Sequence, residues 1–267
     1  MTQLLVSVRN VSEAFAAVAG GVDIIDVKEP LHGSLGCAAP TTIREISIAL
    51  SSIDGFSTPL SLALGELTEW DCTPTCPQVG FQAQNDRRTD LQAAINCSSP
   101  QFLKLGLAGT LPSSKNWRTQ WQRVQASIPG HHSWVAVAYA DHTRAAAPTV
   151  TEVLLAAIET RAAVLLIDTH TKDGTSLCDH LTFNELKSLR HETSRHGIQL
   201  AIAGRIAISD LPHLMTLQPD IIAVRGAVCE QGDRTASICE KRIHEFRESL
   251  RIVRSGDFQR PIWGGPI

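Results

Sequence analysis

Residues 23–30, DIIDVKEP, contain two charged side chains within an apolar run. The valine and isoleucines around Asp26 and Lys28 are typical of a β-strand. Because side chains two residues apart in a strand point to the same face, Asp26 and Lys28 share one face. Hydrophobic packing does not explain two neighbouring charges, so the end of this strand is a candidate functional site.

Similar apolar runs recur along the chain, and helix-like segments separate them. Eight alternations in 267 residues predict a single-domain α/β protein, a closed (β/α)8 TIM barrel. An open doubly wound sheet is the alternative, but it usually has fewer strands, and no GxGxxG turn follows the first run. The predicted strands are residues 4–10, 23–30, 59–66, 102–109, 134–141, 163–170, 198–206 and 220–228. The predicted helices are residues 11–19, 41–50, 86–95, 116–128, 149–160, 182–196, 209–217 and 236–253.

Two segments depart from this alternation. Residues 67–87 contain a tryptophan, two cysteines, two prolines and few helical signals. The alternation continues after them, so we interpret them as an insertion rather than a domain boundary. Residues 255–267 have the composition of an irregular C-terminal tail, which leaves residues 1–254 for the barrel.

The composition excludes several classes of protein. A hydrophobic content of 43% supports a sizeable core, and a net charge of −3 predicts no surface for nucleic acid or an acidic membrane. No apolar run is long enough to span a bilayer, and residues 1–10 do not resemble a signal peptide. We therefore expect a cytoplasmic protein that binds neither nucleic acid nor membranes.

The seven cysteines do not predict a disulfide framework, because their number is odd and no secretion signal is present. Cys72 and Cys76 are four residues apart, but a zinc site needs two further Cys or His ligands at a recognisable spacing. His131 and His132 are adjacent, which suits a loop better than a pair of ligands. We expect no metal site.

Charged residues gather at the ends of the predicted strands, where a (β/α)8 barrel carries its active site. A single charge there is usually a solvated rim residue or half of a structural ion pair. Three lysines and three aspartates are harder to explain in that way. They are Asp26, Lys28, Lys104, Asp141, Asp168 and Lys172.

A lysine in such a cluster suits covalent catalysis. The alternation of residues 102–109 places Lys104 on the face opposite three leucines, so this lysine is expected to point into the barrel mouth. Burial or a neighbouring cation lowers the pKa of a lysine and frees its amine to attack a carbonyl. The aspartates can then transfer protons. This reasoning does not choose among Lys28, Lys104 and Lys172 as the nucleophile, and an Asp26–Lys28 pair with a purely structural role is the simpler alternative.

Two glycine–arginine pairs follow the last two predicted strands, where barrels often bind phosphate. Glycine lets the backbone approach an anion, and arginine is a bidentate partner. The segment HGSLG, residues 32–36, is a weaker candidate, because in isolation it reads as a tight turn. The candidate phosphate-binding residues are Ser34, Gly204, Arg205, Arg225 and Gly226. Asp141 is an additional candidate for substrate binding.

Several motifs resemble the (5-formylfuran-3-yl)methyl phosphate synthase family, and they are spread over nearly the whole chain. The blocks DIIDVKEP…GSLG and IDTxxKDGxxLxDxL are fairly specific, whereas the glycine–arginine turns are generic. The matching segments are LLVSVRNVSEAFAAVAGGVDIIDVKEPLHGSLG (4–36), FLKLGLAG (102–109), WVAVAYAD (134–141), LLIDTHTKDGTSLCDHL (165–181), LAIAGRI (200–206) and PDIIAVRGAVC (219–229). The insertion and the C-terminal tail depart from the family pattern.

The resemblance implies a barrel enzyme that joins two glyceraldehyde 3-phosphate molecules, with loss of phosphate and water, early in methanofuran biosynthesis. It implies that Lys28 forms a Schiff base and that Lys104 is a general acid/base. Asp26, Asp168 and Lys172 match supporting polar residues, and no organic cofactor is required. We also expect a homo-oligomer.

Two other functions remain open. Another class I aldolase of a phosphosugar would share the barrel, the lysine and the phosphate turns. A non-catalytic barrel that binds a phosphorylated metabolite is the alternative from a different class. The set of lysines and aspartates speaks against a binding protein, and product analysis distinguishes the two enzymes.

Overall fold

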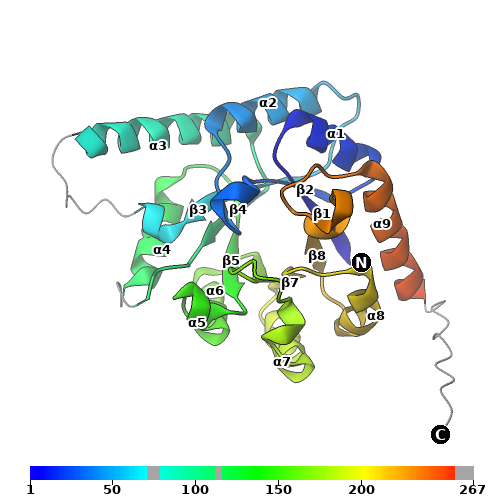
Figure 1. Ribbon diagram of the computed structural model, residues 1–267. Helices are drawn as coiled ribbons and strands as arrows, with labels where there is room; N and C mark the ends of the chain where they lie inside the picture. Colours follow the sequence, from blue (N-terminus) through cyan, green and yellow to red (C-terminus); the bar gives the residue numbers. More distant parts are fainter. Residues whose placement is uncertain (71–78, 112–115, 256–267) are drawn as a thin grey trace, which may run out of the picture.

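The computed structural model describes residues 1–70, 79–111 and 116–255. Eight parallel strands form a closed barrel in sequence order, with helices around it (Figure 1). The predicted single-domain (β/α)8 barrel is therefore confirmed. The strands are β1 (Gln3–Val8), β2 (Ile24–Val27), β3 (Leu60–Glu66), β4 (Phe102–Gly106), β5 (Ser133–Tyr139), β6 (Val164–Asp168), β7 (Gln199–Ile202) and β8 (Ile221–Val224).

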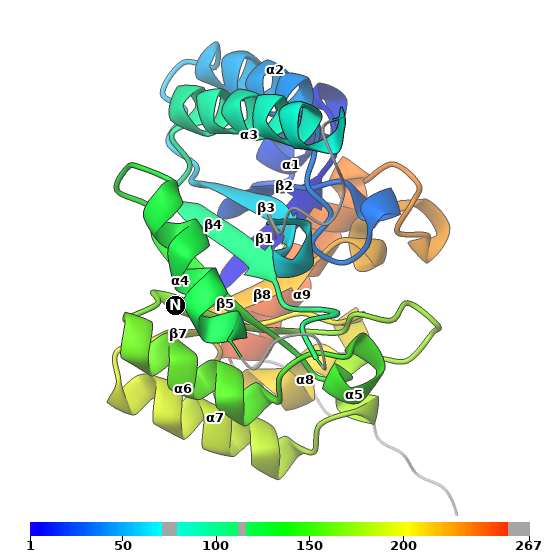
Figure 2. The same ribbon diagram turned by 90° about the vertical axis from the view of Figure 1, so that its left-hand side faces the viewer.

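The helices pack on the outside of the strands, with α2 and α3 on one side of the barrel and α6 and α7 on the other (Figure 2). The helices are α1 (Val11–Ala19), α2 (Pro40–Ser51), α3 (Val79–Ser98), α4 (Trp117–Ser127), α5 (His142–Ala145), α6 (Val150–Thr160), α7 (Phe183–Arg195), α8 (Leu211–Leu214) and α9 (Glu240–Ser255). The short 3-10 turns are η1 (Pro30–His32), η2 (Leu67–Trp70), η3 (Leu177–Asp179), η4 (Ile208–Asp210), η5 (Met215–Leu217), η6 (Gly226–Val228) and η7 (Glu230–Gly232).

Helix boundaries agree best with the sequence where a cap is present. The bounds of α1 are those predicted, and the side chain of Asn10 accepts a hydrogen bond from the Glu13 amide at its start. In contrast, α3 begins at Val79, inside the segment that was interpreted as an insertion. Cys72 and Cys76 lie outside the described residues. Among the described helices, none is long and apolar enough to cross a bilayer.

The hydrophobic core has two layers, one between strands and helices and one inside the barrel. On β4, Leu103 and Leu105 face the helices, whereas Phe102 lies in the interior layer. On β2, Ile25 faces the helices and Ile24 the interior. The alternation that the sequence predicted for both strands is confirmed. It directs the side chains of Asp26 and Lys104 into the barrel.

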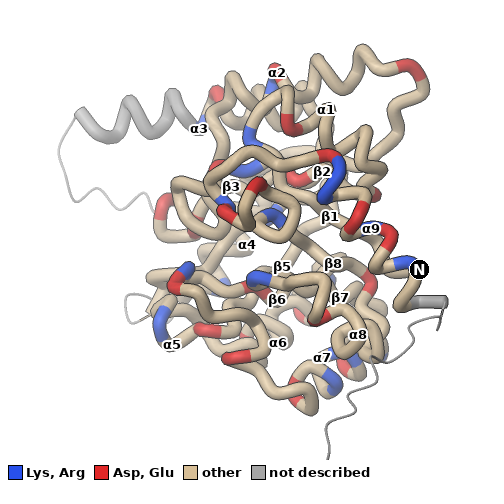
Figure 3. The backbone as a smooth tube through the Cα atoms, turned by 45° about the vertical axis from the view of Figure 1, so that its right-hand side comes forward, with Lys and Arg blue, Asp and Glu red and all other residues tan. Residues whose placement is uncertain are grey.

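The register of the sheet places the interior polar residues at one level. Asp26 on β2 pairs with Ser7 on β1 and with Ser61 on β3. Lys104 on β4 pairs with Ala63 on β3. Charged residues also occur throughout the surrounding helices, as Figure 3 shows. Within the barrel they occur toward the C-terminal ends of the strands, which is where a site is expected.

Candidate active site

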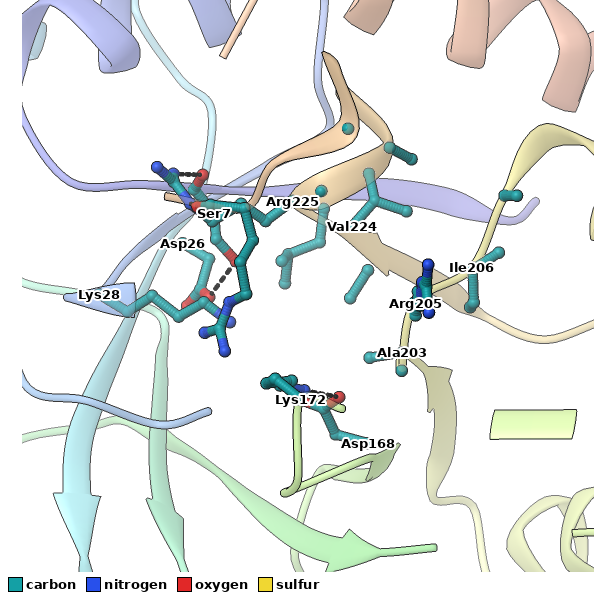
Figure 4. A pocket seen from close by; sticks show the side chains of 18 of the residues that line it. Ser7, Asp26, Lys28, Asp168, Lys172, Ala203, Arg205, Ile206, Val224 and Arg225 are labelled. Carbon is teal, nitrogen blue, oxygen red and sulfur yellow. Dashed lines mark hydrogen bonds and ion pairs between the residues drawn. The ribbon is translucent and has the colours of Figure 1, made fainter. Parts of the chain in front are cut away.

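A cavity of about 540 Å³ opens at the C-terminal ends of the strands. This volume lies within the range of pockets that hold small-molecule ligands. Most of the candidate residues from the sequence line it, namely Asp26, Lys28, Lys104, Asp168, Lys172, Gly204, Arg205, Arg225 and Gly226. Figure 4 shows Lys28 reaching in from β2, with Asp168 and Lys172 across the cavity.

Asp26 and Lys104 form a buried ion pair. Nζ of Lys104 lies 2.6 Å from Oδ1 of Asp26, and the two side chains are only 5% and 1% exposed. The Ser7 hydroxyl donates to Oδ2 of Asp26 at 2.9 Å. Burial alone would raise the pKa of Asp26, but the charges of Lys104 and Lys28 outweigh it and lower the pKa below its ordinary value. Asp26 is thus a carboxylate that is held in position from two sides.

Asp168 and Lys172 form a second pair at the end of β6. Nζ of Lys172 lies 3.4 Å from Oδ1 of Asp168 and also donates to the backbone carbonyl and the hydroxyl of Thr169. The Thr169 amide donates to Asp168 at 2.7 Å. Burial opposes ionisation of Asp168, but Lys172 and Lys28 lower its pKa below the ordinary value. Asp26 and Asp168 are therefore each paired with a lysine of their own.

Lys28 follows β2 directly and has a different environment from the other two lysines. Its Nζ donates to the Ser34 carbonyl at 3.1 Å, and no ion pair within the described part of the chain includes it. Burial is the main reason that the pKa of Lys28 is lowered to about 8. The positive charges of Lys104 and Lys172 lower this pKa further, whereas the negative charges of Asp26 and Asp168 partly oppose the shift. At pH 7 about one amine in ten is then neutral, whereas an ordinary lysine is almost fully protonated.

Arg225 has protein partners rather than a surface that is open to an anion. Its guanidinium carries five N–H groups. Nη1 donates to the Ser7 carbonyl and to Glu13, at 2.9 and 2.8 Å. Nη2 donates to Glu13 and the Ala236 carbonyl, both at 3.2 Å, and Nε donates to the Arg234 carbonyl at 2.6 Å. All five donors are used, in contrast to the phosphate contact that the sequence suggested for this residue.

Ser34 and Asp141 lie near the site but are not among the residues that line the cavity. The fully buried Ser34 hydroxyl contacts the carbonyls of Thr169 and His170, at 2.8 and 3.1 Å. Asp141 accepts hydrogen bonds from the amides of His170 and Thr171, at 2.7 and 2.8 Å. Both residues bind the backbone of the loop after β6, which carries Lys172, so they stabilise the position of this loop.

Gly204 is buried and has φ of +98°, in the left-handed region. A Cβ atom at this position would lie 3.1 Å from the Cγ2 atom of Thr169 and 3.3 Å from the Cβ atom of Leu177. Only glycine fits both the conformation and the space. The next residue, Arg205, is exposed and lines the cavity, and its guanidinium lies next to Gly174 in the loop after β6.

The structure adds residues that the sequence did not single out. The Tyr139 hydroxyl, buried inside the barrel, donates to Glu66 at 2.6 Å, and the Ala108 amide donates to the same carboxylate at 2.8 Å. Burial raises the pKa of Glu66. Burial and the negative charge of Glu66 together raise the pKa of Tyr139. Glu66 and Tyr139 are not among the residues that line the cavity, whereas Arg234, from the loop before α9, does line it. Glu66 is the last residue of a predicted strand, and this position could have marked it as a candidate. Arg234 lies in a loop, where no periodic pattern of the sequence could have indicated it.

The described residues contain no cluster of three or more His, Cys, Asp or Glu side chains arranged around a metal position. Among the described residues, Cys37, Cys97, Cys178, Cys229 and Cys239 form no disulfide. The ionisable side chains that line the cavity are amines, carboxylates and guanidinium groups. Amines and carboxylates are suited to imine formation and proton transfer.

Comparison with solved structures shows the same architecture at low sequence identity. The chain superimposes on thiamine phosphate pyrophosphorylase from Pyrococcus furiosus with a TM-score of 0.57, at 13% identity over 94% of this chain and 96% of the other. Phosphoribosyl anthranilate isomerase from Thermus thermophilus gives 0.54, at 13% identity over 96% and 99%. At this identity the likeness shows the fold alone.

Comparison of sequences identifies the family. Residues 4–247 match the model of the 4-HFC-P synthase family. The chain is 32% identical over 253 residues to (5-formylfuran-3-yl)methyl phosphate synthase from Methanococcus maripaludis, covering 94% of this chain and 99% of that protein. The protein of the same name from Archaeoglobus fulgidus is 31% identical over 250 residues, covering 93% and 99%. The resemblance seen in the motifs is confirmed, and the chain belongs to the 4-HFC-P synthase family.

Proposed function

We propose that this protein is a cytoplasmic Schiff-base enzyme that makes (5-formylfuran-3-yl)methyl phosphate from two glyceraldehyde 3-phosphate molecules. Phosphate and water are released, and the product serves methanofuran biosynthesis. The observation that carries the proposal is the environment of Lys28. Its amine has a pKa lowered to about 8 and lies in a cavity that also contains two lysine–carboxylate pairs.

In the proposed first step, the neutral amine of Lys28 attacks the aldehyde carbon of one triose phosphate. Loss of water gives an imine, which makes the adjacent C–H acidic. A carboxylate or neutral amine in the cavity removes that proton and forms an enamine. Asp26 with Lys104 and Asp168 with Lys172 are the two acid/base pairs available for these transfers.

The enamine carbon then attacks the aldehyde of the second triose phosphate, which forms the new carbon–carbon bond. A hydroxyl group closes the ring onto the carbon bonded to Lys28 and displaces the amine, which frees the enzyme. Loss of a second water and elimination of one phosphate then lead to the furan. Each step moves a proton, so two separate acid/base pairs have clear uses. None of these steps needs an organic cofactor or a metal ion.

Borohydride trapping tests the proposal. Incubation with glyceraldehyde 3-phosphate and borohydride should add one substrate-derived mass to the peptide that contains Lys28. The Lys28→Ala variant should show neither adduct nor furan product, and ultraviolet absorption detects the furan. Full turnover by Lys28→Ala would refute the assignment. A trapped adduct without furan product would instead indicate another class I aldolase.

A further inference from the structure

Arg234 and Lys28 both contact the loop that follows β2. Its Nη2 donates to the Gly33 carbonyl at 3.0 Å, and Nζ of Lys28 donates to the Ser34 carbonyl at 3.1 Å. These two carbonyls belong to consecutive residues, so the guanidinium and the amine are held by the same short segment of the chain. Both residues line the cavity. An arginine brought in from the β8–α9 loop thus reaches the loop after β2.

Among the described residues, Arg234 has no carboxylate within ion-pair distance. Burial lowers the pKa of Arg234, and the more distant charge of Asp168 acts in the opposite direction. The ion pairs found within 4 Å among the described residues do not include it. Its neighbour Asp233 also lines the cavity, but one oxygen of that carboxylate accepts hydrogen bonds from the amide and hydroxyl of Thr235, at 2.9 and 2.8 Å. Apart from the Gly33 carbonyl, no described group accepts a hydrogen bond from the guanidinium. It therefore has donors available for a ligand.

The backbone of Arg234 is held by the buried Arg225. Nε of Arg225 donates to the Arg234 carbonyl at 2.6 Å, and Glu13 anchors Arg225 through both carboxylate oxygens. The Glu13 side chain is only 2% exposed, so this anchor lies in the protein interior. The guanidinium of Arg234 is thereby presented to the cavity on a fixed support, which reduces the entropy lost when a ligand is bound.

We propose that Arg234 binds the phosphate of the triose phosphate that is attached to Lys28, and that Arg225 is a positioning residue for it. This inference rests on the proposed function. A triose phosphate has only three carbons between its ends, so the anion ligand of the covalently bound molecule must lie close to the lysine. Arg234 is held by the same short segment of the chain as Lys28, and its planar donors suit bidentate contact with phosphate. Arg205, beside Gly174, is left for the second triose phosphate.

The test compares an aldehyde with and without phosphate in the full-length protein. The concentrations of glyceraldehyde 3-phosphate and of glyceraldehyde that give half-maximal borohydride trapping on Lys28 are measured for Arg234→Gln and Arg234→Lys. Loss of charged hydrogen bonds to phosphate should raise the value for the phosphorylated aldehyde by about 10- to 100-fold in Arg234→Gln. In Arg234→Lys the half-maximal concentration of glyceraldehyde 3-phosphate should rise less, since the lysine keeps the positive charge. The half-maximal concentration of glyceraldehyde should change by less than about twofold in either variant.

The exposed Arg195→Gln on α7 is the matched control and should change neither value. An equal loss with both aldehydes would overturn the inference, because it would make Arg234 only a structural contact to Gly33. If wild-type protein traps neither aldehyde, the proposed function fails instead.

A measurement on wild-type protein covers the case in which the variants do not fold. Phenylglyoxal modifies arginine side chains, and peptide mass spectrometry gives the extent of labelling at each position. Glyceraldehyde 3-phosphate should protect Arg234 from labelling, whereas glyceraldehyde should not, and Arg195 should be labelled equally in both. Equal labelling of Arg234 with the two aldehydes would refute phosphate binding there.

Discussion

The Asp26–Lys104 pair is the most buried ion pair across the cavity, and removing one partner should be costly. The substitution Asp26→Asn keeps the side-chain shape and an acceptor for the Ser7 hydroxyl, but it leaves the Lys104 ammonium without its counter-charge. Because the two side chains are 5% and 1% exposed, water cannot compensate. Breaking a buried pair in this way typically costs about 3–5 kcal/mol of unfolding free energy. For a protein of this size the melting temperature should fall by about 10 °C.

Urea denaturation followed by circular dichroism measures the effect, with the double variant Asp26→Asn/Lys104→Met as a partner. Removing both charges should restore much of the stability, since no unpaired ion remains. The exposed pair Arg118–Glu159, whose side chains are 37% and 53% exposed, supplies the control. Glu159→Gln should cost less than about 1 kcal/mol. If Asp26→Asn costs no more than Glu159→Gln, the pair is screened by solvent and the reasoning fails.

Three further results are expected. The rate of borohydride trapping at Lys28 should rise with pH and level off above about 8, since the pKa in the folded protein is lowered and the neutral amine reacts; a midpoint near 10.4, the value of a free lysine, would contradict this. Tyr139→Phe should lower the unfolding free energy by about 1–3 kcal/mol in urea denaturation, through loss of a hydrogen bond to Glu66. Glu13→Gln should raise KM for glyceraldehyde 3-phosphate more than it lowers kcat, because Arg225 loses its charged anchor. Glu13→Asp keeps the charge and should bring KM part of the way back to the wild-type value. An unchanged KM in Glu13→Gln would argue against a positioning role for Arg225.

Features that depend on a repeating pattern could be predicted from the sequence. The strand alternation correctly directed Lys104 into the barrel, because Leu103 and Leu105 define the opposite face of β4. The start of α1 was likewise fixed by the local cap at Asn10. In both cases the relevant interaction lies within a few residues, so the local sequence carries the information.

Features that depend on distant partners could not be predicted. Arg225 follows a strand end and therefore suggested anion binding, but its guanidinium is bound by Glu13, which is 212 positions away in the chain. Arg234 lies in a loop, and its contact is with Gly33, which is 201 positions away in the chain. The start of α3 was missed because the first residues of this helix carry no clear apolar periodicity.

The small side chains of β3 have a consequence for how this chemistry can change over time. Lys104 and Asp26 are on β4 and β2, and β3 runs between them with Ser61 and Ala63 facing inward. Two strand spacings amount to roughly 10 Å, which a lysine can bridge only if nothing bulky stands in its path. A leucine at position 63 would leave the sequence of charged residues unchanged and still obstruct the contact between Lys104 and Asp26. The range of substitutions that keep this ion pair is therefore limited by two small neighbours that carry no charge.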